Sequence, residues 1–167
     1  QRQLSPRRLL VIAPAGRLHG LPFHALTDGA TYLCQRAVVS YAPSLTALDF
    51  SLARAAELPT HPQSILAVAV EQFGDSVPPL PHASDEAELA ARFFHKSELL
   101  CNSSATPEIV IAKLSGGYDA LHFATHSIFD AQFGRLSRLL LHGGDLQADE
   151  IEQLSLSARL ATLTACH

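Results

Sequence analysis

Two short segments in the last third of the chain hold residue types that carry out nucleophilic chemistry. Residues 121–127 contain His122 and His126, and residues 163–167 contain Cys166. A thiol with a pKa of roughly 8.5 is only a few per cent thiolate at neutral pH, so it needs a neighbouring imidazole to become an effective nucleophile. The same imidazole can then protonate the leaving amine of a cleaved peptide bond. The two segments therefore predict a cysteine nucleophile with a histidine partner.

Each of these segments ends an apolar run that predicts a buried strand, one over residues 118–125 and the other over residues 158–165. Open parallel sheets place their sites at the carboxyl ends of their strands. Cys166 follows His126 by 40 residues, so the fold has to bring the two side chains together. A buried structural cysteine is the alternative that these residues leave open.

Length and composition predict one globular domain. A chain of 167 residues can bury roughly 70% of the surface that it exposes when unfolded. The hydrophobic content of 47% and the charged content of 17% predict a packed interior and exclude a disordered chain. The net charge is −4 and no basic cluster is present, so we do not expect nucleic acid as a partner.

The cysteine pattern predicts a reduced, cytoplasmic setting. Three cysteines make an odd number, none are spaced C-x-x-C, and the residues before them show no signal-peptide pattern. The longest apolar runs fall far short of the roughly 20 residues that cross a bilayer, so we expect no membrane association. The chain lacks methionine and begins at Gln1, which predicts a piece of a longer polypeptide.

Strand and helix patterns alternate along the chain. A short apolar run at residues 9–13 predicts a strand buried on both faces, and the apolar run at residues 65–70 predicts a central strand. The helix expected over residues 84–94 would pack through Leu89, Phe93 and Phe94. The other expected elements are strands at 37–41, 98–101, 118–125 and 158–165, helices at 45–58, from 106 to Gly116, and at 146–154, and a hairpin at 138–146. This order predicts an α/β domain with a mainly parallel sheet.

The same segments, in the same order, resemble the CHAT domain family. These domains are caspase-like cysteine peptidases of clan CD, and they often occur beside TPR repeats. The resemblance covers nearly the whole chain and includes both catalytic motifs. It rests on residues 9–14 with Leu18, residues 21–26, 41–44, 80–83 with Glu86 and Ala87, and residues 105–106, 118–126, 146–151 and 163–166.

The resemblance implies a caspase-like sheet flanked by helices and truncated on its C-terminal side. Residues 1–167 would be a single CHAT-like domain fragment that ends just after the nucleophile. Cys166 would be that nucleophile and His126 the acid and base of a hydrolase that cleaves protein substrates through an acyl-enzyme. The family needs no metal or organic cofactor. It also implies possible TPR repeats in the parent protein and a regulatory protein partner.

Three further residues receive supporting roles. Ser127 stands where the family commonly has glycine, and its backbone N–H is the candidate donor to the oxyanion. His167, beside the thiol, either lowers the pKa of that thiol or is a neutral change. His122 either orients the motif or is a hydrogen-bonded core histidine. A metal held by His122 and His126 is not expected, because no third ligand has a clear spacing.

Two other classes of function remain open. A CHAT-like scaffold without peptidase activity would bind a protein partner; Ser127 and the early chain end favour it, whereas the presence of His126 and Cys166 favours the enzyme. A nucleotide-binding domain lacks support, because the chain has neither G-x-G-x-x-G nor a P-loop. Asp130 is a candidate for binding a basic substrate side chain or for orienting its loop, and the alternative is a solvated acidic residue in the turn after a strand.

Overall fold

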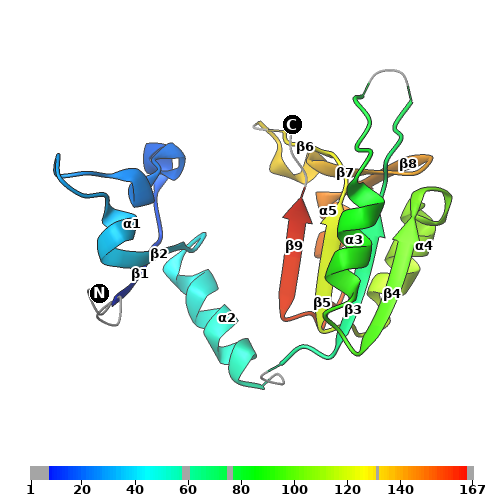
Figure 1. Ribbon diagram of the computed structural model, residues 1–167, viewed down its shortest axis with the longest axis horizontal. Coiled ribbons are helices and arrows are strands. Elements are labelled where there is room, and N and C mark those ends of the chain that lie inside the picture. Colours follow the sequence, from blue (N-terminus) through cyan, green and yellow to red (C-terminus); the bar gives the residue numbers. More distant parts are fainter. Residues whose placement is uncertain (1–7, 58–60, 75–76, 131, 165–167) are drawn as a thin grey trace. The chain divides into compact units, whose positions relative to one another are not determined.

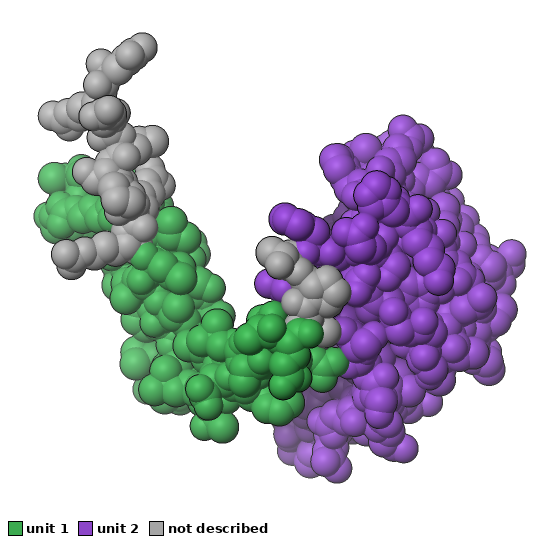
Figure 2. Space-filling view, turned by 90° about the horizontal axis from the view of Figure 1, so that it is seen from below, with its two compact units in different colours: residues 1–59 green, residues 60–167 purple. Residues whose placement is uncertain are grey.

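The computed structural model describes residues 8–57, 61–74, 77–130 and 132–164 (Figure 1). The chain forms two compact units, residues 1–59 and residues 60–167, which Figure 2 shows in different colours. No helix within the described ranges has both the length and the apolar character required to cross a membrane.

The first unit contains a pair of parallel strands, β1 (Arg8–Ile12) and β2 (Ala37–Tyr41). The helices α1 (Leu33–Arg36) and α2 (Leu45–Glu57) and the 3-10 turns η1 (Gly16–Gly20) and η2 (Phe23–Ala25) complete it. The strands expected at 9–13 and 37–41 and the helix at 45–58 are confirmed. Burial of the first strand on both faces is wrong, because Leu9 is 66% exposed. In the described residues β1 pairs with β2 alone, so one edge of β1 has no neighbouring strand to help cover it.

The second unit is built on a four-stranded parallel sheet with the order β4-β3-β5-β9. Its strands are β3 (Ser64–Ala69), β4 (Lys96–Cys101), β5 (Ala120–Ala124) and β9 (Leu160–Thr164). β3 lies inside the sheet and is almost entirely buried, which confirms the prediction of a central strand. Helices flank the sheet, so the fold is the predicted α/β class and is consistent with a caspase-like fold.

Helix α3 (Ala83–Ala91) lies across β3 and β5 (Figure 1) and ends three residues earlier than predicted. The predicted packing is wrong for Leu89, which is 56% exposed, and for Phe93, which is 81% exposed. Phe94 is partly buried and packs against Ile65, Ala91 and Ala120, as expected for it. The helix and the sheet meet through small side chains, so the bulky side chains of the helix lie on its solvent-facing side. The buried stripe consists of alanines spaced four apart, namely Ala83, Ala87 and Ala91.

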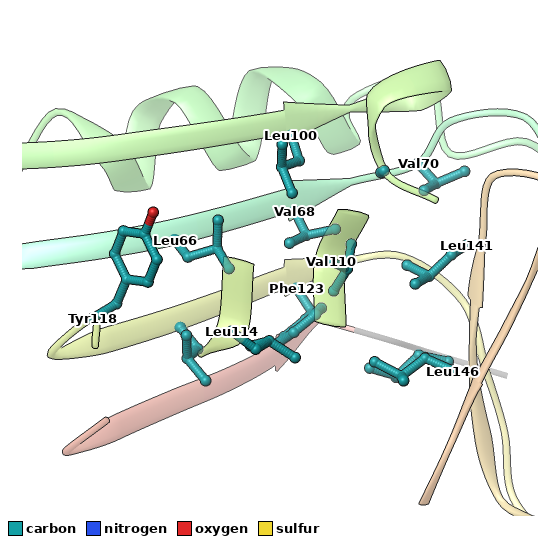
Figure 3. Close-up of a cluster of buried hydrophobic side chains, with 13 residues drawn as sticks. Leu66, Val68, Val70, Leu100, Val110, Leu114, Tyr118, Phe123, Leu141 and Leu146 are labelled. Carbon is teal, nitrogen blue, oxygen red and sulfur yellow. The ribbon is translucent and has the colours of Figure 1, made fainter. Parts of the chain in front are cut away.

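The opposite face of the sheet carries the main hydrophobic core (Figure 3). Leu66 and Val68 of β3 and Phe123 of β5 pack there against Val110 and Leu114 of helix α4 (Pro107–Leu114). The predicted start of this helix is confirmed by the Thr106 side chain, which caps it by accepting a hydrogen bond from the Ile109 N–H at 3.4 Å. The helix ends before the two glycines at 116–117, as expected.

A small antiparallel sheet with the order β6-β7-β8 adjoins the carboxyl end of β5. The hairpin of β7 (Arg138–Leu141) and β8 (Gly144–Gln147) is confirmed, whereas the two-residue strand β6 (Ser127–Ile128) was not predicted. The short helix α5 (Ala148–Glu152) lies within the range expected for it. Two 3-10 turns, η3 (Asn102–Ser104) and η4 (Gly134–Leu136), complete the unit. Because β6 starts at Ser127, this sheet fixes the segment that carries the candidate histidine.

Candidate functional site

His126 follows the end of β5 by two residues, and β7 holds its backbone in place. The N–H of Leu140 donates a hydrogen bond to the His126 carbonyl at 2.9 Å. The preceding residue, Thr125, is completely buried and donates its hydroxyl to the Leu140 carbonyl. These two bonds join the segment after β5 to one residue of the neighbouring sheet. The histidine is therefore presented at the carboxyl edge of the parallel sheet by a firmly attached backbone.

The imidazole of His126 is positioned by the loop that follows β3. Its Nε2 lies 2.9 Å from the carbonyl oxygen of Pro78, and its ring meets the ring of Phe73 at a centroid distance of 4.9 Å. A carbonyl oxygen can only accept a hydrogen bond, so Nε2 must carry the proton. In the neutral ring the lone pair is then on Nδ1, which becomes the basic nitrogen. The contact with Pro78 thus fixes both the orientation and the tautomer of His126.

His122 is buried in the sheet and has different partners from His126. Its Nδ1 lies 2.7 Å from the Thr162 hydroxyl on β9, which confirms the interpretation as a hydrogen-bonded core histidine. Its Nε2 lies 3.3 Å from Oε1 of Glu86 on α3, without the geometry of a hydrogen bond. Burial lowers the pKa of His122, although the Glu86 carboxylate acts in the opposite direction. His122 therefore links α3, β5 and β9.

The candidate nucleophile Cys166 and its neighbour His167 lie outside the described residues. The described part of β9 ends at Thr164, which pairs in register with Ala124 of β5. Ser127 begins β6, where it pairs with Leu139 of β7. Its role as an oxyanion donor stays a prediction.

Two hollows lie near the segments that hold His126. One, of about 400 Å³, is formed by Phe73, its neighbours and the β7–β8 hairpin. The other, of about 220 Å³, lies between the start of α3 and the ends of β5 and β9, and Glu86 lines it. On the other face of the sheet an apolar groove of about 320 Å³ runs along Phe123 and Leu163.

The remaining polar candidates have structural partners or no site around them. Asp130 orients its own loop, since its Oδ1 accepts hydrogen bonds from the backbone N–H groups of Gln132 and Phe133 at 2.9 and 2.7 Å. Burial raises the pKa of the Cys101 thiol, which makes it a poor nucleophile. Among the described residues, no group of three or more His, Cys, Asp or Glu side chains is arranged to hold a metal ion.

Sequence reasoning located His126 at the end of a strand but missed the groups that orient it. Pro78 acts through its backbone carbonyl, which every residue type possesses, so its residue type gave no indication of the contact. In the sequence, Glu86 is recognisable only as part of a segment that resembles the family. Nothing in the local pattern indicated that it lines a hollow, because the other wall comes from β5 and β9.

The described fold is an α/β protein with a parallel sheet, consistent with a caspase-like fold, and it presents a histidine at the carboxyl edge of that sheet. A family model described as the CHAT domain matches residues 1–167. The chain therefore belongs to the CHAT domain family, and the match includes both compact units. No curated protein matches the chain.

Proposed function

We propose that this protein is a caspase-like cysteine endopeptidase in which Cys166 is the nucleophile and His126 the acid and base. The observation that carries the proposal is the fixed imidazole of His126 at the carboxyl end of β5, with Nε2 bound to the Pro78 carbonyl. That contact assigns the basic lone pair to Nδ1. Membership of the CHAT domain family supports the proposed caspase-like class of activity.

The register of the sheet supports a meeting of His126 with Cys166. β5 and β9 are paired from Ala120 with Leu160 to Ala124 with Thr164. His126 follows Ala124 by two residues, and Cys166 follows Thr164 by two residues, so the separation in sequence between the paired residues also relates His126 to Cys166. Two extended residues span at most about 7 Å, and neighbouring strands lie about 4.8 Å apart. The paired ends of β5 and β9 and this short span support our proposal that the thiol meets the imidazole.

The proposed reaction starts when the Cys166 thiol gives its proton to Nδ1 of His126. The thiolate attacks the carbonyl carbon of the scissile bond, and the backbone N–H of Ser127 is our candidate donor to the oxyanion. The C–N bond then breaks as the imidazolium protonates the leaving amine, which leaves a thioester acyl-enzyme. Water adds to the thioester and gives a proton to His126, and the C–S bond breaks as the thiol regains its proton. His167 is our candidate for lowering the pKa of the thiol, and His122 is our candidate for orienting the histidine motif.

The proposal extends to the organisation and setting of the protein. The family match supports a single CHAT domain that includes both compact units. Protein substrates, a regulatory protein partner, TPR repeats in the parent protein and a cytoplasmic location are part of the proposal. They follow from the resemblance of the motifs and from the cysteine pattern.

Labelling with a peptide-based acyloxymethyl ketone tests the proposal. The full-length protein is treated with the probe, and mass spectrometry locates the adduct. We expect the adduct at Cys166, with a labelling rate that falls at least about 100-fold in His126→Ala, as for the loss of a general acid and base. His95→Ala is the matched control, because His95 is an exposed histidine after α3, and it should label like the wild type. Labelling of Cys166 no faster than that of Cys34 would contradict the proposal.

A scaffold without peptidase activity is the second candidate, and one observation favours it. The apolar groove of about 320 Å³ runs along β9, where Leu163 is 62% exposed, and such a surface suits a protein partner. The labelling experiment separates the two functions, because the scaffold requires no difference between wild type and His126→Ala.

A further inference from the structure

We infer that Glu86 selects substrates with a lysine or arginine on the amino side of the scissile bond, an inference that rests on the proposed peptidase function. The hollow of about 220 Å³ that Glu86 lines is smaller than the roughly 300–1,000 Å³ of sites that enclose a whole small molecule. A hollow of this volume can hold one amino-acid side chain. Its walls are formed by Leu80, Pro81, His82, Ala83, Ala124 and Thr164.

The hollow lies at the ends of the two strands that lead to the proposed catalytic residues. Ala124 is the last residue of β5 and precedes His126 by two positions. Thr164 is the last residue of β9 and precedes Cys166 by two positions. The loop that contributes Leu80 also contributes the Pro78 carbonyl that holds His126. A substrate residue next to the scissile bond is therefore the part of the substrate closest to this hollow.

The charge of the hollow fits a cation. The Glu86 side chain is 41% exposed, and its carboxylate lies 3.3 Å from Nε2 of His122. Burial lowers the pKa of His122, although the Glu86 carboxylate acts in the opposite direction, and the lowered pKa favours the uncharged imidazole beside that carboxylate. His82, which also lines the hollow, has its Nδ1 3.5 Å from the carboxylate of Asp85, so its ion-pair contact is with Asp85. None of the described residues that line the hollow is a lysine or an arginine.

The rest of the wall suits the stem of a basic side chain. Leu80 and Pro81 are apolar, and Ala83 and Ala124 are small and buried. Lysine and arginine combine an apolar stem with a charged end, so the stem can contact these residues while the charge meets Glu86. Asp130, the other acidic candidate, accepts hydrogen bonds within its own turn.

The test compares kcat/KM for peptides that differ only in the residue before the scissile bond: lysine, arginine, glutamine or glutamate. The full-length protein should prefer lysine and arginine. Glu86→Gln should lower kcat/KM for these two by about 10- to 100-fold and leave the glutamine peptide unchanged, as expected for loss of a partly exposed charge pair. Asp85→Asn is the matched control. It removes a carboxylate that is 82% exposed in the same helical turn and lies outside the hollow, and it should change kcat/KM less than about twofold.

A second variant keeps the test decisive if Glu86→Gln fails to fold. His82→Lys places a cation in the hollow from a side chain that is 87% exposed, so folding should be preserved. It should lower kcat/KM for the lysine and arginine peptides by a similar factor and raise it for the glutamate peptide. Equal kcat/KM for all four peptides, or values that neither Glu86→Gln nor His82→Lys changes, would overturn the inference.

Alkylation by iodoacetamide distinguishes failure of this inference from failure of the proposed function. This small, uncharged reagent does not use the hollow. If alkylation of Cys166 depends on His126 but the peptides show no basic preference, the selectivity is wrong and the peptidase proposal stands. If alkylation of Cys166 does not depend on His126, both are wrong.

Discussion

The Thr125 hydroxyl holds the segment that carries His126, and its removal has a calculable cost. Thr125 is completely buried, and its hydroxyl donates to the Leu140 carbonyl. Thr125→Val replaces this hydroxyl by a methyl group of nearly equal size, so it leaves a buried carbonyl without its donor and creates little cavity. A buried unsatisfied polar group costs about 1–3 kcal/mol. Opening of this segment should therefore become about 5- to 150-fold more frequent.

Hydrogen exchange followed by mass spectrometry measures this opening in the full-length protein. Peptides from β5 to β7 should exchange about 5- to 150-fold faster in Thr125→Val, while peptides from α2 keep their protection. Thr46→Val is the control, because Thr46 is exposed on α2 and its substitution removes a hydroxyl without orphaning a buried group. Exchange in β5 to β7 that matches the wild type would refute the argument that this bond holds the segment.

Three further predictions concern stability, measured by urea denaturation. Ala87→Leu should lower the free energy of unfolding by about 1–3 kcal/mol, because Ala87 is buried where α3 packs on the sheet. Leu89→Ala, at an exposed position of the same helix, should change it by less than about 0.5 kcal/mol. Equal effects of the two substitutions would refute the packing of α3 through its alanines. Burial lowers the pKa of His122, so on acidification this histidine is protonated in the unfolded chain at a higher pH than in the folded protein. The free energy of unfolding should therefore fall as the pH drops below 6.5, and His122→Gln should remove this fall. A pH profile of His122→Gln that matches the wild type would contradict the prediction. Burial and the bond to Glu98 raise the pKa of Tyr118 to about 12, so stability should fall as the pH rises above 10, and Tyr118→Phe should lack that part of the fall; a profile identical to the wild type would be the contrary result.

The positions of most elements could be predicted because burial leaves a local pattern. The apolar run at 65–70 predicted β3, observed at Ser64–Ala69, to within one residue. Thr106 and Pro107 predicted the start of α4 through capping chemistry that is also local. The buried alanines of α3 were not predicted, because alanines look unremarkable in sequence. Their fit depends on Ala67, Ala69 and Ala124 of the sheet, which are distant in the chain.

The candidate site could be predicted only as far as residue types reveal chemistry. His126 was recognisable as an imidazole after a strand, and the structure places it there. Its orientation depends on the Pro78 carbonyl, a backbone atom from another loop, so no pattern of side chains indicated it. The hollow at Glu86 likewise forms only when α3, β5 and β9 are assembled. Cys166 remains a prediction of sequence and register.

The central claim is that His126 activates Cys166. The most direct test is the rate of Cys166 alkylation by iodoacetamide between pH 6 and 9, in the full-length protein and in His126→Ala, with the exposed Cys34 as internal reference. We expect wild-type Cys166 to react at pH 6.5 at least about tenfold faster than Cys34, because its thiolate persists well below the ordinary pKa of roughly 8.5. In His126→Ala the Cys166 profile should move to that of Cys34. Wild-type and His126→Ala profiles that both follow Cys34 would contradict the account.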